Sequence, residues 1–386
     1  MMERSGFNNA TLKFQNRGLV LRLVTTGECA SRIDVSKQTG LSKMAATNII
    51  AGFIEENILE ERETIQVKGK GRNPIWLGLS PKAPRIVGVY VGTRDCTVVL
   101  ADMHLQILAR AGFAISQENH SSLTDTMCRY IDRILKKTSG EKIWGISVST
   151  VGAVDIQKGT IKNPLDLYGP EEIPVVQILK EKYNLPVMLE TRYNGAALAE
   201  KLYGNAKDVE NFLFCGICEE VGSGLVIGGT TGSVYGMTGN LGHTSIEVKG
   251  RQCKCGRRGC LTMYASTPVI RAKYRKAASE ELPFREICRN AEKGEENAAA
   301  ILDGMTERLA SGLINAANLF TPQKILLGFD ACCLPAKYIS RLETLINEES
   351  LSGEPVPVQK SSLGRNAGIK GCASKLLMSV FDGTLL

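Results

Sequence analysis

Three cysteines and one histidine that lie close together in the sequence have the residue types and spacing of a metal site. Cys253, Cys255 and Cys260 form a C-x-C-x4-C cluster, and His243 lies ten residues before the first of them. Three thiolates and one imidazole make a complete tetrahedral set for Zn2+. Glycines inside the loop allow it to curl until the sulfurs converge. We therefore predict a structural zinc site; the alternative is a set of three buried free cysteines.

The other cysteines do not suggest disulfides. They are scattered through apolar surroundings in a chain of 386 residues whose polar start has no apolar core of a secretion signal. Cys215 and Cys218 have redox spacing, but they lie inside an apolar, strand-like run, so we interpret them as buried thiols. No apolar run approaches the roughly 20 residues of a membrane helix. These features predict a cytoplasmic protein with reduced thiols.

Composition and charge point to a globular protein with a basic N-terminal part. Hydrophobic residues make up 43% of the chain and charged residues 23%, which is ordinary for a globular protein and gives a chain of this length two or three domains. Residues 1–85 carry 13 Lys/Arg and 8 Asp/Glu, so five of the seven net positive charges lie there. A basic segment of this kind is typical of a polyanion-binding protein.

Three short helices are predicted near the N-terminus. Residues 16–26 have one apolar face. Ser31 and Ser42 are typical N-caps of two further helices, and Gly40 is a typical end for the first of these. The two helices joined by residues 39–42 have the spacing of a helix-turn-helix motif.

The third helix and the strands after it suggest a DNA-binding surface. The β-prone runs 59–69 and 73–79 flank a basic, glycine-rich tip, so residues 10–80 are predicted to form an α+β winged helix-turn-helix domain whose third helix enters the major groove. A protein-interaction domain is the alternative. The residues expected to contact DNA are Lys43, Met44, Thr47 and Asn48 on this helix and Lys70 and Arg72 on the wing.

From residue 86 onward the pattern changes to α/β. Residues 86–115 predict three successive strands, and an amphipathic helix at 122–138 and a strand at 142–150 follow. A second run of strands starts near residue 211, and the helix and strand within 306–329 would complete it. Residues 81–85, with two prolines close by, are predicted to be a linker.

These motifs resemble those of the ROK family (repressors, open reading frames and sugar kinases). The resemblance rests on Leu241–His243, the cysteine loop and Tyr264–Ser266, and the order of strands and helix from residue 86 on is similar to the actin-like sugar-kinase fold. It implies a two-lobed α/β domain. The first lobe would span 86–200, and the second lobe, 201–386, would contain the zinc loop and the C-terminal helices.

The resemblance also implies that kinase activity is lost. Where a working kinase of the family has an acidic residue for magnesium this chain has Tyr90, and where the family has its general base this chain has Arg192. A tyrosine cannot hold magnesium as a carboxylate does, and an arginine stays protonated. The phosphate loop at 222–224 keeps its glycines, whereas the adenine-side glycine pair has become Gly328–Phe329.

The sugar site implied by the resemblance is altered too. Asn240 and Thr262 occupy the positions of two glutamates that hold sugar hydroxyls in the family. Asn194 and His243 match the residues that the family has at their positions. His243 would serve both the sugar and the metal. Such a site would bind a different sugar or sugar derivative through these four residues; a pocket without a ligand is the alternative.

Together, these features predict a DNA-binding transcriptional regulator of carbohydrate-metabolism genes, most similar to ROK repressors and without enzymatic activity. It would bind a palindromic operator as a homodimer or homotetramer, because one half-site offers too few base contacts. Two alternatives remain open. One is an active sugar kinase with an accessory DNA-binding domain, and the other is a regulator controlled by a protein partner.

Overall fold

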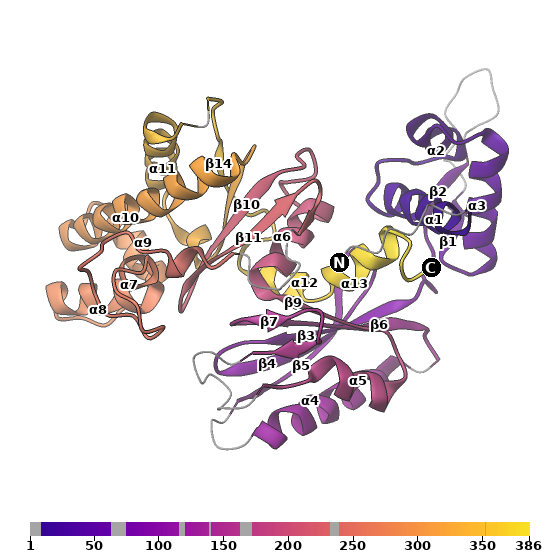
Figure 1. Ribbon diagram of the computed structural model, residues 1–386, viewed down its shortest axis with the longest axis horizontal. Helices are drawn as coiled ribbons and strands as arrows, with labels where there is room; N and C mark the ends of the chain where they lie inside the picture. The colour runs from indigo at the N-terminus through magenta and orange to yellow at the C-terminus, as the bar shows by residue number, and fades with distance from the viewer. Residues whose placement is uncertain are drawn as a thin grey trace.

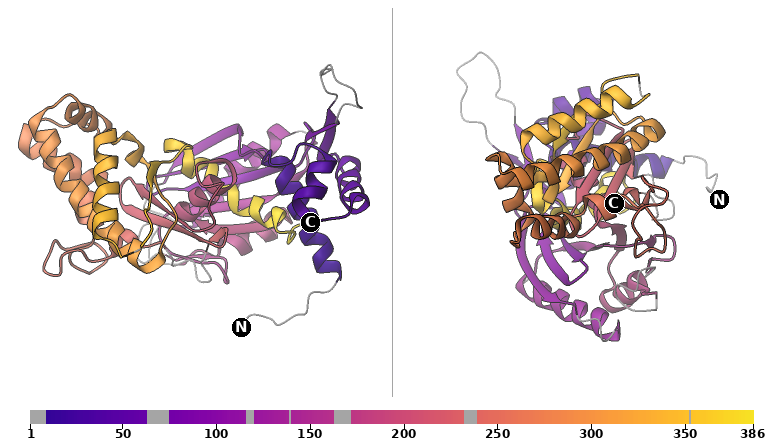
Figure 2. Two further views of the ribbon diagram at one scale, coloured as in Figure 1. Left: turned by 90° about the horizontal axis from the view of Figure 1, so that it is seen from above. Right: turned by 90° about the vertical axis from the view of Figure 1, so that its left-hand side faces the viewer.

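The computed structural model consists of an N-terminal unit and two lobes, each lobe built around a five-stranded sheet (Figure 1). The N-terminal unit and the helices of the second lobe lie at opposite ends of the molecule (Figure 2). Within the described part of the chain, no helix has both the length and the apolar character that crossing a bilayer requires. The structure describes residues 9–62, 75–115, 120–138, 140–162, 172–231, 239–351 and 353–386.

Three helices and two antiparallel strands form the N-terminal unit: α1 Asn9–Thr25, α2 Arg32–Thr39, α3 Lys43–Glu55, β1 Leu59–Arg62 and β2 Trp76–Leu79. The predicted caps are confirmed. The Ser31 hydroxyl accepts a hydrogen bond from the Asp34 N–H at 3.2 Å, and the Ser42 hydroxyl accepts one from the Ala45 N–H at 3.1 Å. Gly40 ends α2 with φ of 71°, which glycine adopts without strain.

The apolar faces of these helices meet in one core, as the sequence pattern predicted. Its buried members include Val20, Leu23 and Val24 of α1, Val35 of α2, and Ala46, Ile50 and Phe53 of α3. The tip between β1 and β2, with Lys70 and Arg72, lies outside the described residues.

The first lobe has the strand order β5-β4-β3-β6-β9. Strands β3, β4 and β5 form an antiparallel meander, and β6 and β9 run parallel to β3. The order of three strands, a helix and a fourth strand is the one that the sequence pattern predicted. Helices α4 and α5 cover one face, where apolar side chains of both layers interlock. The elements are β3 Arg85–Val91, β4 Asp95–Ala101, β5 Ile107–Ala114, α4 His120–Leu135, β6 Ile143–Thr150, β7 Val154–Asp155, β8 Thr160–Ile161, α5 Val175–Tyr183 and β9 Val187–Thr191.

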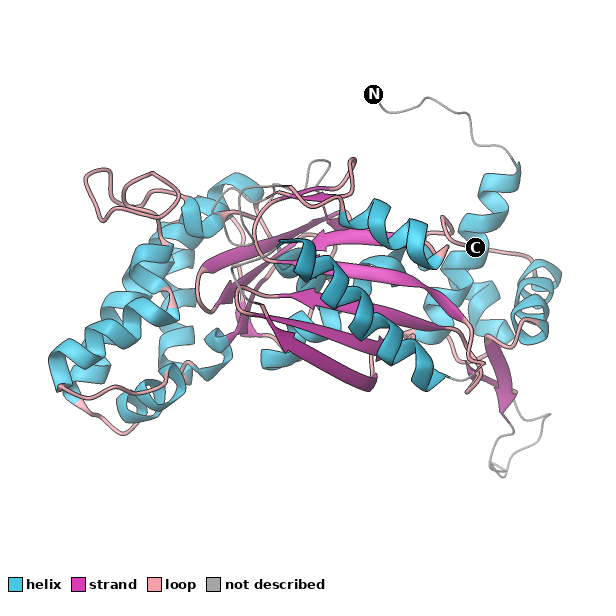
Figure 3. Cartoon of the chain, turned by 90° about the horizontal axis from the view of Figure 1, so that it is seen from below, coloured by secondary structure: helices cyan, strands magenta, loops and turns pink. Residues whose placement is uncertain are grey.

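The second lobe repeats this plan with the strand order β12-β11-β10-β13-β14. Again a meander is extended by two parallel strands, and a bundle of helices forms the outer end of the lobe (Figure 3). Helix α6 Arg192–Tyr203 leads from the first lobe into the second. The elements of the second lobe are β10 Phe212–Ile217, β11 Val221–Ile227, β12 Thr230–Thr231, α7 Thr262–Ala265, α8 Thr267–Ala278, α9 Phe284–Glu292, α10 Glu296–Phe320, β13 Ile325–Phe329, α11 Ala336–Glu349 and β14 Val358–Lys360.

The C-terminal helices correct the predicted lobe boundaries. Helices α12 (Ala367–Gly371) and α13 (Ser374–Phe381) do not belong to the second lobe as expected. Helix α12 packs on α6, and α13 packs on β6 and β9 of the first sheet and on α1 (Figure 1). The predicted boundary at 200/201 also falls inside α6. The assignment of these helices by their order in the sequence was wrong, because the end of the chain returns to the first lobe and covers the open face of its sheet.

The predicted linker is packed rather than free. Ala83 is 2% exposed and lies in the same core as the N-terminal helices and α13. Arg85, expected to end the linker, begins β3, and its guanidinium donates to the carbonyl of Pro81 at 2.7 Å. The N-terminal unit is therefore docked on the first lobe through a shared core.

Two glycines bring α1 and the C-terminal segment into backbone contact. A Cβ on Gly18 would lie 2.5 Å from the carbonyl oxygen of Phe381, and a Cβ on Gly383 would lie 2.4 Å from that of Phe14. Both distances are well below van der Waals contact, so the two backbones approach this closely only because side chains are absent.

This close approach makes Gly18 a test of the docking. We expect Gly18→Ala to lower the free energy of unfolding by about 1–3 kcal/mol, because the added methyl meets backbone that cannot move aside. The matched control is Gly304→Ala, where a Cβ in the middle of α10 meets no atom within 4 Å. That change should stabilise the chain by about 0.5–1 kcal/mol. Urea unfolding followed by circular dichroism measures both, and equal effects would contradict the docking.

Candidate functional site

The predicted metal ligands converge in the structure. One donor atom from each of His243, Cys253, Cys255 and Cys260 can be chosen so that all four lie within 4.8 Å of one another. The Cys253 sulfur is 3.7 Å from His243 Nδ1, and the Cys255 and Cys260 sulfurs are 3.6 Å apart. A tetrahedral zinc site with Zn–S bonds of about 2.3 Å has edges of about 3.8 Å. The donor set and its spacing therefore fit one tetrahedral ion.

The loop is shaped by short backbone contacts. Gly259 has φ of 73°, and a Cβ there would lie 1.7 Å from the carbonyl oxygen of Glu247. The Cys253 N–H donates to the Arg257 carbonyl at 2.8 Å, which closes the turn that carries two of the ligands. Burial and the neighbouring thiols raise the pKa of Cys260 to about 12 in the absence of an ion. A bound cation would favour the thiolate instead.

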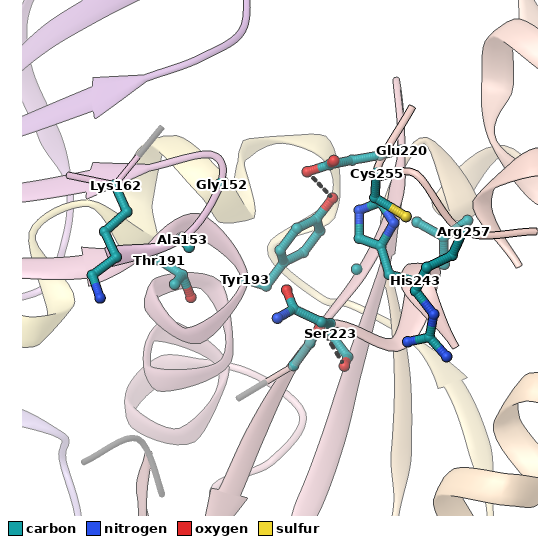
Figure 4. Close-up of a pocket in the computed structure, with 14 residues that line it drawn as sticks. Gly152, Ala153, Lys162, Thr191, Tyr193, Glu220, Ser223, His243, Cys255 and Arg257 are labelled. Atoms are coloured by element: carbon teal, nitrogen blue, oxygen red, sulfur yellow. Dashed lines mark hydrogen bonds between the residues drawn. The ribbon is translucent and has the colours of Figure 1, made fainter. Parts of the chain in front are cut away.

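A cavity of about 330 Å³ lies beside this loop, between the two lobes (Figure 4). Its wall includes His243 and Cys255, so the metal-binding loop and the cavity share residues. Because Nδ1 of His243 faces Cys253, its other ring nitrogen is left for the cavity. The remaining lining residues are Gly152, Ala153, Lys162, Thr191, Tyr193, Glu220, Val221, Gly222, Ser223, Gly239, Asn240 and Arg257.

Of the four residues predicted to bind an effector, Asn240 and His243 line the cavity and Asn194 and Thr262 do not. Asn194 is fully buried: its amide donates to Glu190 at 2.9 Å and accepts from the Leu225 N–H at 3.3 Å. The Thr262 hydroxyl accepts from the Val221 N–H at 3.1 Å. Both side chains are thus used to hold the wall of the cavity.

Sequence reasoning missed several polar residues of the cavity, among them Thr191, Lys162 and Arg257. Thr191 lines it in place of Asn194, and Lys162 and Arg257 bring two positive charges to it. Thr191 stands next to Arg192, which the resemblance places at the position of the general base, and this adjacency was a usable signal. Arg257 lies inside the cysteine loop, but only the fold turns it toward the cavity. No local pattern marks Lys162.

The two substituted kinase positions, Tyr90 and Arg192, contact each other. The Arg192 guanidinium donates to the Tyr90 hydroxyl at 3.3 Å and to the Tyr193 hydroxyl at 2.8 Å. It also lies 3.3 Å from the Glu220 carboxylate and 2.9 Å from the Cys218 sulfur. Burial acts to lower the pKa of Arg192, but these neighbours raise it well above its ordinary value. The side chain therefore carries a positive charge and has no basic lone pair.

Aromatic rings fill the space beside the glycines of the phosphate loop. A Cβ on Gly222 would lie 2.2 Å from the ring of Tyr193, and a Cβ on Gly216 would lie 2.4 Å from the ring of Phe329. Phe329 itself has φ of 55° and ψ of −128°, a backbone conformation that glycine adopts far more readily. Its ring stacks edge-on with Tyr193 at 5.6 Å, which compensates for the strain.

The residues expected to contact DNA on α3 share one exposed face. Met44 is 75% exposed, and Lys43, Thr47 and Asn48 are exposed as well. The opposite face of α3 is buried in the core of the N-terminal unit. The helix thus presents a polar, basic surface that no other described part of the chain covers.

The cluster of His243 and three cysteines yields a direct test. We expect the purified protein to hold about one zinc ion per chain and Cys255→Ser to hold much less, because three protein ligands cannot close a structural site. A chelator should lower the urea midpoint of the wild type and leave that of the variant unchanged. Cys333→Ser, a cysteine outside the cluster, is the control and should behave as wild type. Equal metal content in all three proteins would refute the site.

Comparisons with known proteins agree with the geometry. The family model described as "ROK family" matches residues 86–378. The xylose repressor of Bacillus spizizenii is 26% identical over 96% of this chain and 97% of its own length. A solved ROK family transcriptional regulator, described as a homologue of the E. coli Mlc protein, superimposes with a TM-score of 0.83 at 24% identity, covering 97% of this chain and 98% of its own.

A second solved structure covers only part of the chain. The ROK hexokinase of Thermus thermophilus superimposes with a TM-score of 0.64 at 26% identity over 75% of this chain and 97% of its own. The two-lobed fold predicted from the sequence is thus that of regulators and sugar kinases alike. The chain belongs to the ROK family.

Proposed function

We propose that this chain is a DNA-binding transcriptional repressor of carbohydrate-metabolism genes whose sugar-kinase fold has lost catalysis and serves as an effector-binding domain. The observation that carries the proposal is the contact between Arg192 and Tyr90, since it occupies the two positions that phosphoryl transfer needs. The relatives include a protein named xylose repressor that is similar over the full length, including the N-terminal unit.

We interpret the N-terminal unit as a winged helix-turn-helix domain with α3 as its recognition helix. Helices α2 and α3 pack on each other across the turn at Gly40, and α3 has an exposed face with Lys43 and Asn48. Lysine suits phosphate oxygens or guanine, and asparagine pairs with adenine. Lys70 and Arg72 would add contacts from the wing. A homodimer or homotetramer on a palindromic operator follows from the small area of one such helix.

The domain division that we propose follows the packing. Residues 10–80 form the DNA-binding domain, residues 81–85 are its docked connection, and residues 86–191 with 367–386 form the first lobe. The second lobe spans 204–366, and α6 lies between the two lobes. The metal of the second lobe would be zinc, held by His243, Cys253, Cys255 and Cys260 as a structural ion.

The effector that best fits the interlobe cavity is an acidic sugar derivative. The volume of the cavity, about 330 Å³, is at the lower end of the range for small-molecule sites, about 300–1,000 Å³. Thr191, Ser223 and Asn240 offer groups that hydrogen-bond hydroxyls, as a sugar requires. Arg257, and Lys162 at 3.5 Å from the Asp155 carboxylate, favour a ligand with a phosphate or carboxylate, because the lining carboxylate of Glu220 is already paired with Arg192.

The predicted recognition helix leads to a test with DNA. With an operator fragment selected by the wild type, Asn48→Ala should cost about 1–3 kcal/mol of specific binding and relax the preference for one base. Lys43→Ala should weaken binding to all DNA sequences and reduce the salt dependence of binding by about one phosphate contact. Lys180→Ala, an exposed lysine on α5, is the control. Fluorescence anisotropy at several salt concentrations measures these effects, and unchanged binding by both variants would refute the assignment.

The charged cavity leads to a test with ligands. In a thermal-shift screen, a sugar phosphate or sugar acid should raise the melting temperature, and the neutral parent sugar should have a smaller effect; at 100 times Kd the stabilisation is about 2.7 kcal/mol. Lys162→Gln and Arg257→Gln should reduce the shift, and Lys158→Gln, an exposed lysine outside the cavity, should not.

Two other results would favour the alternatives. A response of DNA binding to a protein partner, with no shift from any sugar, would favour control by that partner. Turnover in a coupled ATP assay over the same sugars would favour an active kinase with an accessory DNA-binding domain.

A further inference from the structure

A second hollow, of about 520 Å³, lies on the second lobe and shares no lining residue with the interlobe cavity. Four cationic side chains from three separate elements line it: Lys249 and Arg251 from the metal-binding loop, Lys273 from α8 and Arg308 from α10. Glu247 is the one carboxylate among its lining residues. The fold thus gathers a net charge of about +3 in one hollow from positions spread over 60 residues of sequence.

These cations differ from other basic side chains of the same lobe. Arg271 of α8 is 2.8 Å from Glu281, and Arg341 of α11 is 2.9 Å from Glu307 of α10. In the described part of the chain, no salt bridge within 4.0 Å includes Arg251, Lys273 or Arg308, although acidic residues are common nearby. Glu247 offsets only one of the four positive charges, so the repulsion that remains favours an anion from outside.

A buried tyrosine holds the two arginines in place. The guanidinium carbons of Arg251 and Arg308 lie 5.4 and 5.7 Å from the centre of the Tyr264 ring, within the range of cation–π contact. Tyr264 is 4% exposed, and its hydroxyl accepts a hydrogen bond from the Arg251 N–H at 2.9 Å. Because the ring is fixed, both guanidinium groups are positioned before any ligand arrives.

The charges are close enough to influence one another. Burial lowers the pKa of Lys273, and the positive charges of Arg251 and Arg308 lower it further. On the floor of the hollow, Gly304 leaves the surface of α10 without a side chain, since a Cβ there would meet no atom within 4 Å. The hollow therefore has free space next to α10 at Gly304, and hydrogen-bond donors line it.

We propose that this hollow is a binding site for a phosphate-bearing small molecule, with Arg251 and Arg308 donating to one phosphoryl group and Lys249 and Lys273 supplying further positive charge. Paired guanidinium groups match the geometry of phosphate oxygens, and ammonium groups add charge without fixing direction. The volume exceeds that of a single phosphate, so a diphosphate or a phosphorylated metabolite fits better than the free ion. The site is independent of the interlobe cavity and of the effector proposed for it.

Calorimetric titration of the full-length, metal-loaded protein with inorganic pyrophosphate tests the proposal. In a buffer without phosphate at fixed ionic strength, we expect one site per chain, weaker binding of inorganic phosphate, and no binding of chloride. The double variant Arg251→Gln/Arg308→Gln should bind pyrophosphate at least about tenfold more weakly. Lys273→Gln, which leaves the metal-binding loop unchanged, should show a smaller loss in the same direction.

Two control variants distinguish binding in this hollow from attraction to general surface charge and from binding in the interlobe cavity. Arg275→Gln/Arg289→Gln removes the same charge from exposed positions outside the hollow and should bind as wild type. Lys162→Gln/Arg257→Gln alters the interlobe cavity and should also bind as wild type. The proposal is overturned if the wild type shows no binding at millimolar pyrophosphate, if both control variants lose as much affinity as Arg251→Gln/Arg308→Gln, or if only the cavity variant loses affinity. Zinc content measured on each variant verifies that the loop is intact.

Discussion

A buried guanidinium, that of Arg192, constrains how the two lobes meet. Its side chain is 3% exposed, and a charge so far from water is tolerated only when neighbouring groups satisfy it. These groups come from both lobes: Tyr90 belongs to the first sheet, whereas Cys218 and Glu220 lie in the turn between β10 and β11 of the second. Removing either set would leave the charge with fewer partners. The lobes are therefore joined at this guanidinium, beside the interlobe cavity.

Around this joint, one part of the region between the lobes is filled and another is open. Arg192 packs against the aromatic rings of Tyr193 and Phe329, and these rings occupy the space beside Gly222 and Gly216. The neighbouring cavity, with Thr191, Asn240 and His243, remains hollow. Tyr193 belongs to both regions, because its ring lies against Gly222 and also lines the cavity. The strained backbone of Phe329 indicates that the filling was gained at some cost in stability.

Local sequence patterns predicted the features that depend on near neighbours. The caps at Ser31 and Ser42 and the convergence of three cysteines in a glycine-containing loop each depend on a few consecutive residues, which the sequence displays. The strand order of the first lobe was also predictable, because its meander is continuous in the chain.

The errors arose where distant segments meet. The return of α13 to the first sheet depends on a face left open 200 residues earlier, and no local pattern records it. Asn194 was assigned to the cavity from the resemblance alone. Thr191, the extended N-cap residue of α6, reaches the cavity, whereas Asn194 in the first turn of the helix hydrogen-bonds within the wall. The hollow around Tyr264 was missed because its cations come from three elements.

The position of α6 suggests how the cavity and the DNA-binding unit are coupled. This helix starts directly after Thr191, packs on α12 and α13, and α13 in turn contacts α1 through the backbone at Gly18. Each step is a closely packed contact, and α6, α13 and α1 share one apolar core, so a displacement of one helix is felt by the next. A ligand changes DNA binding only if it favours one arrangement of the lobes over another. Residues from both lobes line the cavity, and α6 and α13 form a continuous packed path from its wall to α1.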